Sequence, residues 1–428
     1  MLLVLVGVFG IIFFLIGYLS PRKSGWFLIT LLPIASGLVG VTLVPDPSFP
    51  LTLDRAAFMM TLGILVSLNK KGVLLKRMWA QPLTKIIVLF SVGLVLASAR
   101  DDPNFALFFY LPRLFTGLLL GFMFIRKEKD LRRLFRIFAV SGLVIGVFAV
   151  IEYVTHFNLE VYLEQLTDPH FVYANAYVGS SIMSRAGFYR VGGLDGFPVF
   201  TAVRLGFLFP FALWYVSDNK MLGIVSLLFV IVGLILVQTR AAFIGIIVGF
   251  FLLALKSPGQ ITKMIPPTVL VALVLTLLLA QPIKIFEAFW KDSFMRTLNQ
   301  SSTAERAWAI SIAFRYLISR PLTGYGSPGY VYGTLMYTED LPAPAIYAVS
   351  GGLLLGVCYM VWIFYMPFKI FMISLRENLK NYQKYYLNLS FVAVIVGIIP
   401  LFTQFAERHF PIMILLVVGL LNVFPKKE

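Results

Sequence analysis

LLVLVGVFGIIFFLIGYL, residues 2–19 of the chain, is an apolar run without a charged residue. About 18 to 20 apolar residues are enough for an α-helix to cross the hydrocarbon core of a bilayer. Comparable runs recur at 82–99, 221–238 and 409–425. They consist mainly of Leu, Val, Ile and Phe and show no period of two, so they do not predict the strands of a barrel. The sequence predicts an all-α polytopic membrane protein.

Composition supports this class and sets the expected number of spans. Hydrophobic residues make up 59% of the 428 residues, charged residues only 13%, and the mean hydropathy is +0.88. We expect one transmembrane domain, 1–428, with about thirteen spans, or about twelve if a short segment such as 55–69 or 241–255 is re-entrant. The expected spans are 2–19, 26–44, 55–69, 82–99, 105–125, 136–153, 195–216, 221–238, 241–255, 265–281, 345–368, 386–404 and 409–425. The first run lacks the features of a cleaved signal peptide and is expected to remain.

The short loops predict the orientation. Lys and Arg are concentrated in alternate short loops, such as 70–77, 126–136 and 369–384. Loops of this kind face the cytoplasm. Two long loops then lie on the outer side, 154–194 and 282–344, and the second is the longest segment that is too polar for hydrocarbon.

Arginine predominates among the outer cations. Lys284 and Lys291 are the only lysines on the predicted outer side. Positive charge is disfavoured there, and the planar guanidinium group binds phosphate or carboxylate in a bidentate manner. These arginines are therefore candidate anion ligands. The alternative is that each simply pairs with an outer carboxylate.

Three arginines are singled out by depth or position. Arg113 and Arg204 each lie about nine residues into an apolar run, where an ionised side chain usually marks a functional cavity. Arg240 lies at the outer mouth of the helical hairpin formed by 221–238 and 241–255. Together they predict an anion-binding pocket that opens to the outer side. Structural ion pairs remain the alternative for each of them.

The loop 282–344 contains its own helix. Ser302-Thr-Ala-Glu305 is a capping box that begins a helix. This helix ends near Ser319, because Pro321 cannot continue it. Apolar residues surround the axis of this helix, so we expect it to be buried on several sides as a lid over the membrane domain. Arg306, Arg315 and Arg320 would then lie near the mouth of the pocket. The alternative is a helix in the headgroup layer that binds anionic lipid.

Several kinds of chemistry have no motif in the sequence. The three His residues are scattered and match no metal spacing, and the single cysteine, Cys358, allows no disulfide within the chain. A P-loop, a dinucleotide glycine motif and a nucleophile elbow are absent, and Gly324–Gly329 is only a glycine-rich turn. We expect no metal, no cofactor and no nucleic-acid partner.

Three segments resemble the O-antigen ligase and O-antigen polymerase superfamily, bacterial membrane glycosyltransferases of the GT-C class. Arg190-Val-Gly-Gly-Leu-Asp-Gly-Phe-Pro198 precedes a span as in that family, and Thr239-Arg-Ala-Ala-Phe-Ile-Gly245 is similar to its Thr-Arg-Gly hairpin. The stretch from Arg306-Ala-Trp308 to Pro321-Leu-Thr-Gly-Tyr-Gly326 is similar to its large-loop signature. The likeness covers about 135–425.

The resemblance implies an inverting, metal-independent transfer of a glycan from an undecaprenyl diphosphate-linked donor to an acceptor sugar hydroxyl. The reaction would take place at the outer face of the bacterial cytoplasmic membrane, on a GT-C-like fold. By position, Arg190, Arg240 and Arg306 would bind the diphosphate, and Arg113 and Arg204 are added because of their depth. The partners implied are the lipid-linked donor, a glycan or lipid-linked acceptor, membrane lipids and envelope polysaccharide assembly proteins.

One departure from the family affects the expected base. Ligases carry a His-Asn pair before a glycine turn, whereas the loop 282–344 has the turn Gly351–Gly356 after it but contains no His. Glu339 and Asp340 occupy the equivalent region and are the candidate general bases, or else a solvated acidic turn. The missing His favours a polymerase. The alternatives are a ligase with a lipid A-core acceptor, a flippase of lipid-linked oligosaccharides, and a scaffold of an envelope assembly machine.

Overall fold

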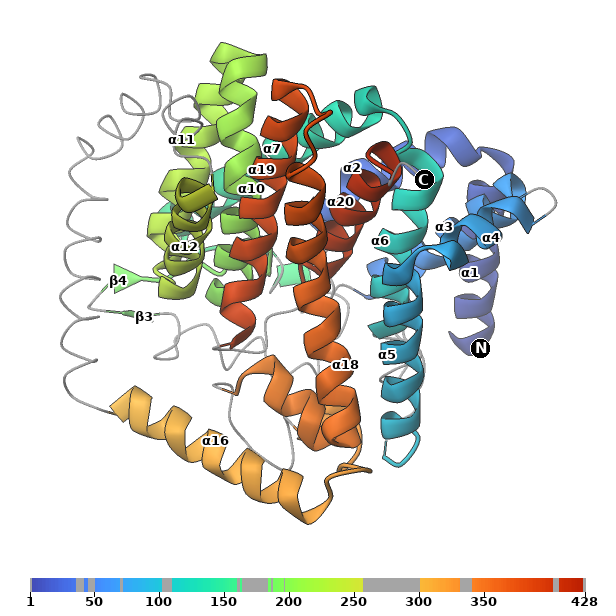
Figure 1. The fold of residues 1–428 in the computed structure, drawn as a ribbon, viewed down its shortest axis with the longest axis vertical. Helices are drawn as coiled ribbons and strands as arrows, with labels where there is room; N and C mark the ends of the chain where they lie inside the picture. The colour runs from blue at the N-terminus through green and yellow to red at the C-terminus, as the bar shows by residue number, and fades with distance from the viewer. Residues whose placement is uncertain are drawn as a thin grey trace.

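The structure, a computed structural model, is a bundle of helices (Figure 1). It describes residues 2–35, 42–44, 51–69, 72–101, 110–159, 162–163, 184–185, 188–195, 197–256, 301–331, 341–402 and 408–425. Most of the loop 154–194 and the expected span 265–281 lie outside these residues, as do Glu339 and Asp340.

The helices follow the apolar runs of the sequence. In the first part of the chain they are α1 (Leu2–Leu19), α2 (Pro21–Ala35), α3 (Leu53–Leu68), α4 (Val73–Ala80), α5 (Pro82–Ser98), α6 (Leu111–Phe124) and α7 (Glu128–Thr155). In the second they are α10 (Pro198–Asp218), α11 (Lys220–Val237), α12 (Arg240–Lys256), α16 (Ser301–Ser319), α17 (Pro328–Tyr330), α18 (Ala343–Ser374), α19 (Asn381–Ile398) and α20 (Phe410–Val423). Short 3-10 turns, η3 (Gly193–Asp195) and η5 (Ile399–Phe402), precede α10 and follow α19. Two small antiparallel strand pairs were not predicted: β1 (Thr42–Val44) with β2 (Leu51–Thr52), and β3 (Ser184–Arg185) with β4 (Phe188–Tyr189).

The predicted class of helical multi-pass membrane protein is confirmed. In the described part of the chain, five helices are long and apolar enough to cross a membrane, namely α7, α10, α11, α18 and the helix 381–402. A sixth span results if α3 and α4, whose axes differ by 113°, form one bent span. Shorter apolar helices, among them α5, α6, α12 and α20, coincide with other expected spans, and the total of about thirteen spans stays a prediction. α7 begins at Glu128, eight residues before the predicted boundary at 136, and includes the basic segment assigned to a loop.

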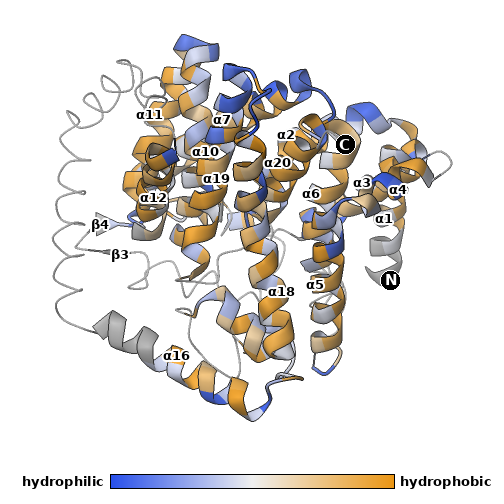
Figure 2. Ribbon diagram, viewed as in Figure 1, coloured by the Kyte–Doolittle hydropathy of each residue, from blue (hydrophilic) through white to orange (hydrophobic). Residues whose placement is uncertain are grey.

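The long helices of the bundle run in alternating directions, which gives the bundle two ends (Figure 1). The basic end holds the starts of α2, α7 and α19 and the turn between α10 and α11, and hydrophilic residues gather there in Figure 2. Arg136 Nε of α7 donates to Asp218 Oδ2 of α10 at 2.6 Å, and Lys256 Nζ of α12 donates to Asn388 Oδ1 of α19 at 2.8 Å. The far end holds the starts of α3, α6, α10, α12, α18 and α20 (Figure 1). Which end faces the cytoplasm stays a prediction.

Close helix contacts and an aromatic cluster fix the far end. A Cβ at Gly117 of α6 would lie 2.2 Å from the carbonyl oxygen of Pro411 in α20, so only glycine allows this approach. Beside this contact, the rings of Phe90, Trp362 and Phe410 are buried, and Trp362 packs edge-on to Phe410 at 4.8 Å. The starts of α6 and α20 are therefore held side by side.

The helix predicted in the large loop exists, but its expected burial is wrong. α16 spans Ser301–Ser319, as the capping box and the proline predict. Trp308, Phe314 and Ile318 are 58%, 61% and 63% exposed. The buried stripe is instead Ala309 and Ala313, because small residues four positions apart let the helix lie close to α18. Thus α16 covers α18 with one narrow face and presents its large apolar side chains outward.

A break in α18 receives the glycine turn that follows α16. Gly352 has φ of +80°, and a Cβ there would lie 2.5 Å from the backbone of Leu322. The break exposes the carbonyl of Val349, which accepts a hydrogen bond from the backbone N–H of Tyr325 at 2.9 Å. The N–H of Leu353 donates to the carbonyl of Pro321 at 2.7 Å. The glycine turn Gly324–Gly329 and the residues just before it therefore bind the broken part of α18.

Candidate functional site

The far end concentrates arginine at the starts of helices. A helix N-terminus carries about half a unit of positive charge from its unsatisfied N–H groups. Of the described helices that begin at this end, α18 carries no arginine in its first turns, whereas α3, α6, α10, α12 and α20 each have one within the first two turns or just before the helix: Arg55, Arg113, Arg204, Arg240 and Arg408. Helix dipoles and side chains therefore contribute charge of the same sign.

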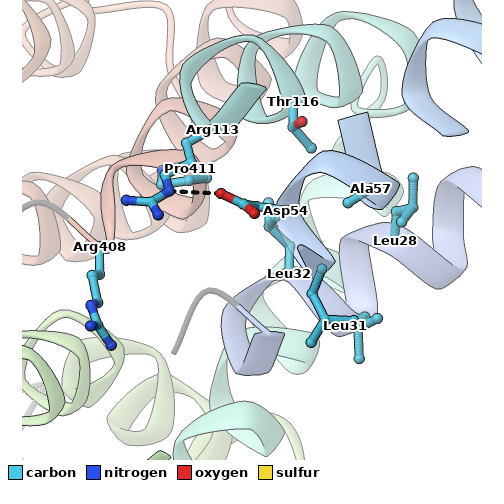
Figure 3. A pocket seen from close by; sticks show the side chains of 10 residues that line it. Leu28, Leu31, Leu32, Asp54, Ala57, Arg113, Thr116, Arg408 and Pro411 are labelled. Carbon is cyan, nitrogen blue, oxygen red and sulfur yellow. Dashed lines mark hydrogen bonds and ion pairs between the residues drawn. The ribbon is translucent and has the colours of Figure 1, made fainter. Parts of the chain in front are cut away.

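Two of these arginines line a small pocket between α2, α3, α6 and α20. The pocket holds about 40 Å³ of space, and leucines of α2 form its apolar wall (Figure 3). Arg113 Nε and Asp54 Oδ2 are 2.9 Å apart across it. The guanidinium carbon of Arg408 lies 4.6 Å from the centre of the Phe200 ring, which connects the start of α20 to that of α10. The pocket is thus lined by two cations and one carboxylate.

Asp54 is held in place by its own neighbours. Its Oδ1 accepts a hydrogen bond from the backbone N–H of Arg55 at 3.1 Å and one from the hydroxyl of Thr52. Arg113 therefore meets a fixed carboxylate, and the alternative that outer arginines pair with acids holds for this residue. Arg113 is the third residue of α6, and the start of the run 105–125, from which its depth was counted, lies outside the described residues.

Arg204 is the arginine buried most deeply. It is the seventh residue of α10 and its side chain is 0% exposed. Its Nη1 donates to the carbonyl of Ile34, in the last turn of α2, at 3.4 Å. A fully buried guanidinium group is costly and therefore a functional candidate by default.

Arg190 connects two of the three sequence motifs. Its Nη2 donates to Thr239 Oγ1 at 3.3 Å, and its Nε donates to the carbonyl of Val237 at 3.5 Å. Between these acceptors, Gln238 adopts the left-handed conformation with φ of +53° and donates to the carbonyl of Tyr189 at 3.3 Å. The segment before α10 and the turn from α11 to α12 are therefore in direct contact.

The remaining predicted site residues are only partly described. Arg240 is the first residue of α12 and Arg306 lies in the second turn of α16, but both side chains lie outside the described part of the structure. Arg315 and Arg320 are exposed, and the guanidinium carbon of Arg320 lies 4.7 Å from the centre of the Tyr325 ring. Among the described residues, no three His, Cys, Asp or Glu side chains form a group that could hold a metal ion.

Glu152 is a residue that the sequence reasoning missed. It lies near the end of α7, is 2% exposed, and accepts hydrogen bonds from the backbone N–H groups of Gly192 at 2.9 Å and Gly193 at 2.6 Å. The hydroxyl of Tyr189 also donates to it at 2.9 Å. Burial raises the pKa of Tyr189, and the charge and hydrogen bond of Glu152 add to that rise. Glu152 thus fixes the segment that carries Arg190.

A signal for Glu152 is present in the sequence. It is the only acidic residue in the apolar run 136–153. An ionisable side chain inside such a run by default has either a function or a buried polar partner. Its partners, however, are backbone groups about forty residues later, which no local pattern identifies.

The resemblance to glycosyltransferases stays a prediction after comparison with known proteins. The case for a function therefore rests on the residues of this chain and their arrangement. Comparison of the chain with family models, with curated proteins and with solved structures finds no match.

Proposed function

We propose that the far end binds the diphosphate of a lipid-linked glycan and that the protein transfers this glycan to an acceptor sugar hydroxyl. The observation that carries the proposal is the gathering of arginines at the starts of α3, α6, α10, α12 and α20. Guanidinium groups and helix N-termini both favour phosphate oxygens. The protein would act in the bacterial cytoplasmic membrane with this end facing outward, as a polymerase or ligase of surface polysaccharide.

The reaction moves negative charge onto the leaving diphosphate. The bond between the anomeric carbon and the diphosphate oxygen breaks, the acceptor oxygen bonds to the same carbon from the opposite face, and the acceptor proton passes to a base. Positive groups fixed around the leaving oxygens stabilise the charge that develops there. Glu339 and Asp340 remain the candidate bases.

Contacts and burial rank the arginines for this role. Arg190 and Arg240 come first, because the hydrogen bond from Arg190 to Thr239 places the two residues on adjoining segments. Arg204 follows because of its complete burial. Arg113 has a carboxylate partner and Arg306 stands on sequence position alone, so both rank lower.

The test is an assay of the purified chain in vesicles with a lipid-linked glycan. We expect chain growth together with released undecaprenyl diphosphate, and a loss of about 10²- to 10³-fold in rate for Arg240→Ala, as when one charge-stabilising donor is removed. Arg136→Ala at the basic end is the matched control and should retain the wild-type rate.

Other outcomes would replace the proposal. Movement of the donor across the bilayer without new glycosidic bonds would identify a transporter. Full activity of Arg240→Ala would exclude Arg240 from the site. Transfer only to a lipid A-core acceptor would identify a ligase.

A further inference from the structure

A basic hollow lies at the opposite end of the bundle from the arginine site. It lies between the first three turns of α2 and the second turn of α7, has a volume of about 520 Å³, and is lined by Arg22, Lys23, Trp26, Phe27, Thr30 and Arg133. Three of its six lining residues are cations and none is an acid. Such a lining attracts an anion of moderate size.

The cations of the hollow differ from their neighbours on α7. Arg132 and Arg136 both donate to Asp218, whereas Arg133 lies against α2. Within the described ranges, Arg22, Lys23 and Arg133 form no ion pair. The charge of the hollow is therefore not balanced by a described carboxylate.

Trp26 gives the hollow a fixed aromatic wall. The guanidinium carbon of Arg133 lies 4.0 Å from the centre of the indole ring, and the ring of Phe124 meets the same indole edge-on at 6.3 Å. Phe27 beside it is 57% exposed. Trp with Lys and Arg at the end of an apolar helix is the composition of a membrane interface, where headgroups meet acyl chains.

We propose that this hollow binds the phosphate of an anionic phospholipid, with the guanidinium groups of Arg22 and Arg133 and the ammonium of Lys23 around the headgroup. The exposed ring of Phe27 then lies beside the acyl chain. Clusters of basic residues next to a spanning helix attract anionic lipid through the same electrostatics. This site is separate from the proposed glycan chemistry and does not depend on it.

The test uses the fluorescence of Trp26 in the full chain. The protein is placed in phosphatidylcholine vesicles that contain a small fraction of either brominated phosphatidylglycerol or brominated phosphatidylcholine. The signal of Trp26 is the part of the quenching that disappears in Trp26→Phe. We expect brominated phosphatidylglycerol to quench Trp26 at a much lower fraction, with about a fivefold loss of preference for each cation removed.

Two triple variants decide the outcome. R22Q/K23Q/R133Q should lose the preference, whereas K129Q/K220Q/K380Q, which removes the same charge from exposed sites at this end, should keep it. If the first triple variant does not fold, R133Q alone is compared with K129Q. Equal quenching by the two lipids, or equal loss in both variants, overturns the proposal. Relief of quenching by inorganic phosphate beyond that by sodium chloride of equal ionic strength would identify free phosphate as the ligand instead.

Discussion

The arginines at the two ends of the bundle differ in how deeply they are buried. At the basic end, the side chains of Arg132 and Arg136 are 52% and 51% exposed and share the carboxylate of Asp218. At the far end, Arg204 is fully buried and donates to the carbonyl of Ile34, and Arg190 donates to a carbonyl and a hydroxyl. An exposed guanidinium group keeps its hydration, whereas a fully buried one loses it.

This difference indicates different tasks for the same residue type. Exposed pairs contribute little free energy, so the arginines of the basic end serve packing and orientation in the membrane. Burial of a guanidinium group is expensive, so a buried arginine at the far end is a candidate for the binding site by default. Mutations matched between the two ends test this comparison directly.

The largest difference in the rate of glycan transfer is expected between Arg204→Met and Arg136→Met. Replacement of the buried Arg204 should lower the rate of glycan transfer about 10²-fold, because one positive group near the leaving diphosphate is lost. The free energy of unfolding should fall by about 1 to 3 kcal/mol, because the partly buried carbonyl of Ile34 loses this donor. Arg136→Met should leave the rate within about twofold. Transfer rate and thermal unfolding of the purified protein measure both effects, and a strongly destabilised but active Arg204→Met would show that the residue is structural.

The next contrast compares the two glutamates of α7. Glu152→Gln places an NH2 group against backbone N–H donors, so we expect a loss of about 2 to 3 kcal/mol in the free energy of unfolding. Transfer should fall about tenfold because the segment carrying Arg190 shifts. Glu128 accepts from Gln383 Nε2 at 3.1 Å and is only partly buried, so Glu128→Gln should cost less than about 1 kcal/mol. Denaturant unfolding in detergent measures the free energy of unfolding of both variants. An equal decrease in the two variants would contradict the proposal that Glu152 fixes the segment carrying Arg190.

The smallest contrast concerns the aspartates that pair with arginine. Asp54→Asn should release Arg113 and lower the KM for the lipid-linked donor about threefold, because a competing carboxylate is gone. Asp218→Asn should leave this KM unchanged, because its arginines lie at the other end. Steady-state kinetics with varied donor concentration measures both. Loss of all transfer in Asp54→Asn would contradict the expectation and assign Asp54 to the chemistry.

Hydropathy and capping signals predicted the helices well where local sequence decides the structure. The bounds of α1 and α16 follow directly from an apolar run and from a capping box followed by proline. α7 is longer than predicted because its first turns are polar, and Arg132 and Arg136 are stabilised there by Asp218. Hydropathy marks the part of a helix inside the bilayer and not its full length.

Features that depend on distant contacts were not predicted. The break in α18 lies where Gly352 contacts Leu322. Glycines inside an apolar run do not by themselves predict a break in the helix. For the candidate site, the contact between the segments of Arg190 and Arg240 agrees with the order of the motifs. Arg408 and Glu152 were missed because their partners lie far away in the sequence.

The docking of the glycine turn also has a consequence for the order of assembly during synthesis. Arg100 Nη1 donates to the carbonyl of Gly324 at 2.9 Å, and Asp101 Oδ1 accepts from the N–H of Ser327 at 2.7 Å, across separations of 224 and 226 residues. The end of α5 therefore leaves the ribosome long before its partners exist. Contacts of such separation close last. Truncated chains that end before residue 321 should thus insert α5 without anchoring its end, and this junction forms late in the synthesis of the protein.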